Sequence, residues 1–304
     1  MILGILCGFL AAFCQCVSYI FSKKYVHKDG NSFQLLIASH LIMGGFAAIC
    51  LIVLLLDNDL PPFKDYWLAL LKVDGFYLLA QLSFFLAISK TEASRLAPLL
   101  GLKIIFIAIL GLIFWKQSLD GLQWLAVFVC LAGAVMSNWS GKSIPLAGIV
   151  WLLGAVVGYS LSDISIKELI DCVQTENGKG VFSILVAASV SYFYLGIFSL
   201  VVMLFTKKVK LKHFKPAICF SCFWFAAMLL LFACFGLIGP LFGNLVQAGR
   251  GIMAVILGVV VANLGWSEHE EKISTKLLIL RIIAAMLVTG SIILFAVAKY
   301  CKQV

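Results

Sequence analysis

The sequence predicts an all-α integral membrane protein with ten transmembrane helices, arranged as two inverted five-helix repeats. Hydrophobic residues make up 63% of the 304 positions and charged residues only 12%, whereas a soluble domain carries roughly 25% charged residues. Long apolar runs follow one another along the chain, and small-residue motifs recur in the same order in its two halves. The net charge of +9 comes mostly from lysines between the apolar runs, which is typical of orientation signals rather than of nucleic-acid binding.

Ten apolar runs predict the membrane spans, since a helix needs about 20 apolar residues to cross a bilayer. The first run has neither a basic leading segment nor a small-residue cleavage site, so we expect a retained helix and not a cleaved signal peptide. The ten cysteines lie mostly inside the runs, where they act as small hydrophobic residues and predict no disulfide framework. The predicted spans are 3–21, 33–56, 67–89, 94–115, 121–139, 146–166, 181–205, 214–235, 238–262 and 276–298.

The two halves of the chain share an ordered set of small-residue motifs. Five spans are repeated once, and because five is odd, the second copy must cross the membrane in the opposite sense. We therefore expect one repeat at residues 1–140 and the other at 141–304. The matching pairs are Gly4-x-x-x-Gly8 with Gly154-x-x-x-Gly158, Ala97-Pro98 with Gly239-Pro240, Gly111 with Gly258, and Gly133 with Gly290.

Two cations are predicted to lie deep inside the fourth and ninth spans. Lys103 and Arg250 stand about 10 and 12 residues into their runs, roughly 15–18 Å from the helix start. A charge at this depth costs at least ~2.5 kcal/mol and indicates a functional site. Both cations would favour a substrate that bears a carboxylate or phosphate. The alternative is an internal ion pair, for which Asp163 on the sixth span is the obvious carboxylate.

Other polar side chains fall on the same spans. Gln247 lies three residues before Arg250, on the same helix face, and Asn244 lies one turn earlier. Gln81 is in the middle of the third span, and Tyr159 is on the sixth near Asp163. Each of these residues could bind a solute, or it could only tie helices together. Glycine and proline are dense from 236 to 251, where we expect a hinge, with close helix packing as the alternative.

The layout resembles the drug/metabolite transporter superfamily, specifically its EamA-type ten-helix members. The stretch from Gly111 to Gly133 carries the resemblance. The family usually has a Glu just after the fourth helix, a Gly nine residues on and another Gly seven further, and Gln117, Ala126 and Gly133 hold these places. The resemblance implies a carrier that moves a small metabolite by alternating access. Similar Lys and Arg residues occur in the fourth and ninth helices of the sugar-phosphate branch of the superfamily.

The sequence thus predicts a secondary transporter for an anionic or zwitterionic metabolite, in the lipid bilayer of the cell membrane. A membrane-embedded enzyme and a non-transporting scaffold are the alternatives, although no catalytic motif or ATP-binding loop is present. We expect no cofactor and no metal site, since His269 in the acidic segment 266–272 lacks partner ligands. A coupling proton, with Asp163 and His40 as candidates, and a counter-substrate both stay open.

The orientation in the membrane is left open by two opposing signals. With the N-terminus inside, seven lysines and arginines would lie on the cytoplasmic side and thirteen on the other. The positive-inside rule therefore favours both termini outside. The resemblance favours the opposite orientation, since many relatives have their termini inside.

Overall fold

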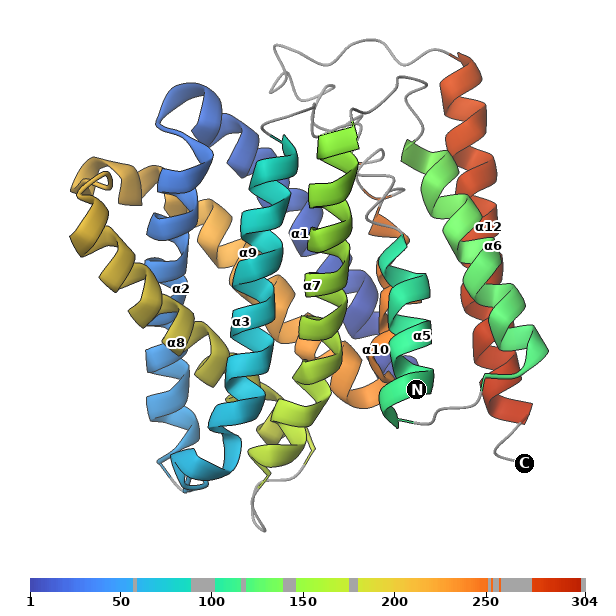
Figure 1. Cartoon of the computed structure of the whole chain (residues 1–304), viewed down its shortest axis with the longest axis horizontal. Coiled ribbons are helices and arrows are strands. Elements are labelled where there is room, and N and C mark those ends of the chain that lie inside the picture. Colours follow the sequence, from blue (N-terminus) through green and yellow to red (C-terminus); the bar gives the residue numbers. More distant parts are fainter. Residues whose placement is uncertain are drawn as a thin grey trace. The chain divides into compact units, whose positions relative to one another are not determined.

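The computed structural model describes residues 1–56, 59–88, 102–115, 119–138, 146–174, 180–250, 253, 257 and 275–301 of the chain. Every regular element in these ranges is a helix, as Figure 1 shows. Seven of the described helices are long and apolar enough to cross a membrane, which agrees with the predicted all-α membrane protein. They are α1 (Ile2–Lys28), α2 (Ser32–Leu54), α3 (Phe63–Ile88), α7 (Leu146–Cys172), α8 (Val181–Thr206), α9 (Phe214–Ile238) and α12 (Thr275–Cys301).

The other three predicted spans coincide with shorter described helices. They are α5 (Lys103–Trp115), α6 (Gly121–Asn138) and α10 (Pro240–Gln247). Residues 89–101 and most of 251–274 lie outside the described residues, and so do Pro98, Gln117, Gly258 and the acidic segment 266–272. The number of ten spans and the inversion of the repeats therefore stay predictions.

Several helices are longer than the apolar runs that predicted them. α1 continues to Lys28, although its run ends near residue 21, so Lys24 and Lys28 belong to its last turns. The aliphatic part of a lysine side chain can cover apolar surface while its ammonium group reaches water, so a helix can extend beyond its apolar run.

Helix starts carry local signals. The Asn31 side chain accepts a hydrogen bond from the Gln34 backbone N–H (2.9 Å) at the start of α2, and the Gln34 side chain accepts one from Asn31 N–H (3.1 Å). Asp120 and Gln123 exchange the same two bonds at the start of α6. Such a capping box satisfies backbone donors that have no partner inside the helix.

The chain divides into two compact units. The first unit is Met1–Asp74 with Ser165–Leu237, and the second unit is Gly75–Ile164 with Ile238–Val304. Each unit therefore takes residues from both halves of the sequence. α3 passes from the first unit to the second between Asp74 and Gly75, and α7 passes back between Ile164 and Ser165. The repeats at 1–140 and 141–304 are a different division of the chain, and they stay a prediction.

In the first unit α2 and α8 lie side by side (Figure 1). Their backbones meet at two glycines, since a Cβ on Gly44 would come within 2.8 Å of the Gly196 Cα. The contact is reciprocal: a Cβ on Gly196 would lie 2.7 Å from the Gly44 Cα. Beside it, the rings of His40 and Tyr192 stack at 6.3 Å between centroids.

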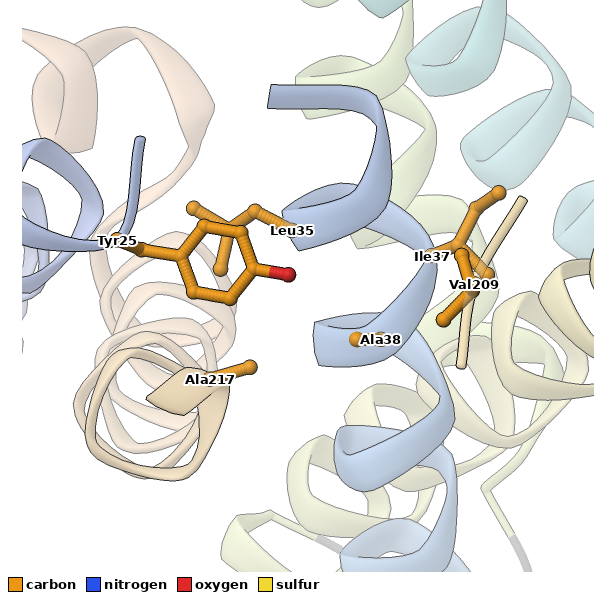
Figure 2. Packing of buried hydrophobic residues seen from close by; sticks show 6 residues of the cluster. All are labelled: Tyr25, Leu35, Ile37, Ala38, Val209 and Ala217. Carbon is orange, nitrogen blue, oxygen red and sulfur yellow. The ribbon is translucent and has the colours of Figure 1, made fainter. Parts of the chain in front are cut away.

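A cluster of buried apolar side chains surrounds the start of α2 in the same unit. Figure 2 shows Tyr25 of α1 and Ala217 of α9 on one side of α2, and Val209 next to Ile37 on the other. Tyr25 and Ala217 are almost completely buried. The cluster thus ties α1 and α9 to α2.

The second unit holds α5, α6, α10, α12 and the remaining parts of α3 and α7. α6 and α12 run side by side, and a Cβ on Gly133 of α6 would come within 3.0 Å of the Ala284 carbonyl oxygen of α12. α3 and α7 approach closely at Gly158, where a Cβ would lie 2.9 Å from the Ala80 Cβ. Small residues permit this closeness, as is usual for helices in membranes.

Candidate functional site

Three predicted site residues meet directly in the second unit, and they come from three helices. Lys103 is the first residue of α5, Asp163 lies on α7, and Asn244 lies in the middle of α10. The Lys103 Nζ is 2.7 Å from the Asp163 Oδ2, and the Asn244 Nδ2 donates to the same Oδ2 at 2.9 Å. The ion pair that the sequence offered as an alternative for Lys103 is therefore the contact that the structure contains.

Asn244 is fixed in position by its own helix. Its Nδ2 also donates to the Pro240 carbonyl oxygen at 2.9 Å, so both amide N–H groups are used. Pro240 is at the start of α10, after Gly239, whose φ of 88° suits glycine better than any other residue. The Gly-Pro pair thus starts the helix that presents Asn244 to Asp163.

Burial differs between the members of the ion pair. The Asp163 side chain is 10% exposed, whereas that of Lys103 is 22% exposed. A lysine ammonium group has three N–H donors, and among the described residues Asp163 is the partner that the structure gives to it. Lys103 is therefore the more accessible end of the pair.

A second polar group lies on α3 and α7 of the same unit. The Gln81 Nε2 donates to the Tyr77 hydroxyl at 3.0 Å, and the Tyr77 ring lies 6.3 Å from that of Tyr159. Tyr159 is one helical turn before Asp163. Gln81 and Tyr159 were both predicted as site residues, and Tyr77 joins them. Its spacing of four residues from Gln81 is a signal that the sequence offered but that the prediction left out.

The last two predicted site residues follow along the ninth span. Gln247 is buried at the end of α10, and Arg250 is partly buried three residues later. Between them the helix changes its hydrogen bonding: the Ala248 N–H is shared by Asn244 O and Leu245 O. α10 therefore begins directly after Gly239, and its regular helix ends after Gln247, both within the segment where the sequence predicts a hinge. Movement at these breaks stays a prediction.

The candidate coupling residues are in different units. Asp163 belongs to the second unit, whereas His40 lies on α2 in the first. The His40 Nδ1 is 2.8 Å from the Leu36 carbonyl oxygen of its own helix. A further buried carboxyl group, that of Asp74 on α3, was missed. An aspartate inside an apolar run is itself the signal that could have revealed it.

A family model matches part of the chain, and a solved structure shares its fold. Residues 2–139 match the family model of the EamA-like transporter family. A solved structure described only as "Crystal structure of protein" shares the fold, with a TM-score of 0.68 over 98% of both chains and 12% sequence identity. No curated protein matches the sequence. The predicted resemblance to EamA-type transporters is thus confirmed over residues 2–139, which match the model of that family.

Proposed function

We propose that the chain is a secondary transporter that moves a small anionic or zwitterionic metabolite by alternating access. The observation that carries the proposal is the Lys103–Asp163–Asn244 contact, which places a charged group between helices of an apolar protein. Charged residues inside membrane segments are costly and usually mark substrate or ion paths. The EamA-like match supports the transporter class.

In this proposal the substrate competes with Asp163 for Lys103. A carboxylate or phosphate oxygen offers the ammonium group the same kind of acceptor that Asp163 provides. Binding would replace one charge-assisted hydrogen bond by another, so the lysine is not left unpaired while the solute is bound or released. Arg250 and Gln247, which follow Asn244 on the same span, would add a bidentate donor and an amide.

The two five-helix repeats belong to the same proposal. Gly196 follows Gly44 by 152 positions, and Tyr192 follows His40 by the same number. These pairs meet in the reciprocal contact of α2 with α8. A reciprocal contact is what a two-fold relation between similar helices produces. The offset is close to the 147 that separates Lys103 from Arg250, which supports an inverted repeat.

The test is counterflow in liposomes that contain the purified protein. The probes are radiolabelled carboxylates, phosphate esters and amino acids, each supplied in turn. We expect Lys103→Ala and Arg250→Ala to weaken apparent affinity for the transported anion roughly 10- to 150-fold each, because a hydrogen bond to a charged group contributes about 1.5–3 kcal/mol. Lys72→Ala is the matched control, since this lysine also pairs with a carboxylate, Glu168, but in the first unit.

The outcomes separate the alternatives. Normal transport by both site variants would refute the proposed site. If Lys103→Ala misfolds and the added Asp163→Asn substitution restores folding but no dependence on Lys103 remains, the ion pair is only structural. A membrane enzyme would show turnover without closed vesicles, and a scaffold would show neither turnover nor counterflow.

A further inference from the structure

We infer that Asp74 is a second ligand site, which binds and releases a proton during transport. It is the twelfth residue of α3 and belongs to the first unit, one helical turn before Tyr77. At 1.5 Å per residue this is ~17 Å from the start of the helix. The residue is 8% exposed, so its carboxyl group is buried deep within an apolar span.

Among the residues that the structure describes, one neutral group donates to the carboxyl group. The Ser191 hydroxyl of α8 donates to the Asp74 Oδ1 at 2.6 Å, and Ser191 is itself buried. The Oδ2 has no hydrogen-bond partner among the described residues. An ionised carboxylate at this depth is costly, and one hydroxyl group does not compensate for a buried charge. The geometry therefore fits a neutral carboxylic acid, which carries a proton.

The lysine nearest to Asp74 on its own helix and the histidine of α2 each contact another oxygen. Lys72 of α3 pairs with Glu168 of α7 at 2.6 Å, and the His40 ring of α2 contacts the Leu36 carbonyl oxygen. Within the described part of the chain the structure pairs Asp74 with no Lys, Arg or His. The remaining ionisable groups on the described parts of α3, α7 and α8 that belong to the first unit are Lys64, Asp65, Tyr66, Lys167, Asp171, Cys172, Tyr192 and Tyr194.

A proton held in this way can be released only when water reaches the carboxyl group. Alternating access supplies such a change, so this inference rests on the proposed transport function. Asp74 is the last residue of α3 that belongs to the first unit. Deprotonation on one side of the membrane and protonation on the other would couple a proton gradient to the metabolite.

The first experiment needs no substrate. Infrared spectroscopy of the purified full-length protein in liposomes detects the C=O stretch of a protonated carboxyl group. We expect this band at neutral pH, its loss in Asp74→Asn, and its retention in Asp163→Asn. In Ser191→Ala the band should shift to higher frequency, because the carbonyl group loses its hydrogen bond. An unchanged spectrum in Asp74→Asn would mean that Asp74 is ionised, and it would overturn the inference.

The second experiment tests coupling with the anion that counterflow identifies. An imposed pH gradient should drive accumulation by the unmodified protein but not by Asp74→Asn, which should still catalyse counterflow because exchange needs no proton release. Equal gradient-driven accumulation by both proteins would refute the coupling role, and so would loss of counterflow in a correctly folded Asp74→Asn protein. If no anion shows counterflow at all, the proposed function and the coupling role fail together, while the infrared result still decides whether Asp74 holds a proton.

Discussion

At the scale of single residues, Asp163 organises the candidate site because one of its oxygens accepts two donors from different helices. Lys103 supplies a charge and Asn244 supplies a fixed amide. A buried charge that loses its partner keeps its desolvation cost but not its attraction. Removing Lys103 or Asp163 alone should therefore cost more stability than removing it from a protein that already lacks the other charge.

This interdependence predicts strong coupling between Lys103 and Asp163. We expect Lys103→Met and Asp163→Leu each to destabilise the protein by up to ~3–5 kcal/mol, the range for breaking a buried pair. The value should fall at the lower end because Lys103 is 22% exposed. The double variant, in which neither charge is left alone, should unfold closer to the temperature of the unmodified protein. Thermal unfolding in detergent, followed by circular dichroism, measures all four proteins. Additive losses in the double variant would show that the two side chains do not interact.

At the scale of helices, the close contacts are made where glycine replaces a side chain. Gly44 of α2 and Gly196 of α8 bring two backbones together, and Gly158 does the same for α7 against α3. Backbone atoms cannot move aside as a flexible side chain can, so a methyl group at these positions forces the helices apart.

Gly44 and its neighbour Gly45 give a matched test of this contact. Gly44→Ala should destabilise the protein by about 1–3 kcal/mol through overpacking, because the new Cβ would lie 2.8 Å from the Gly196 Cα. Gly45→Ala meets nothing within 4 Å and should be neutral or stabilising by up to ~1 kcal/mol through helix propensity. The difference between their unfolding temperatures is the measurement. Equal temperatures would contradict the tight approach of α2 to α8.

At the scale of the whole molecule, ten spans would place both termini on the same side of the membrane. The distribution of lysines and arginines favours an orientation with both termini outside. We expect epitope tags at the N- and C-termini to bind antibodies equally in intact cells. Tags that become accessible only after permeabilisation would reverse the orientation, and tags on opposite sides would show that the number of spans is odd.

The sequence by itself determined the class of the protein and the approximate positions of the seven long helices that the structure describes. Long apolar runs have few alternatives to helices in a bilayer, because every backbone N–H and C=O must be satisfied internally. The position of Lys103 deep within an apolar run also made it a candidate site residue. The choice of Asp163 as its partner agrees with the structure. The prediction could name both roles of Lys103 but could not decide between them.

Only the tertiary structure decided which side chains touch. Helical periodicity assigns a residue to a face of its own helix, whereas contact depends on how distant helices pack. The tertiary structure brings Asn244 to Asp163 across 81 positions, and Ser191 to Asp74 across 117 positions. It also joins Tyr77 to Gln81 and Tyr159. The physical reason is that close packing at glycines, which hydropathy does not record, sets the approach of the helices.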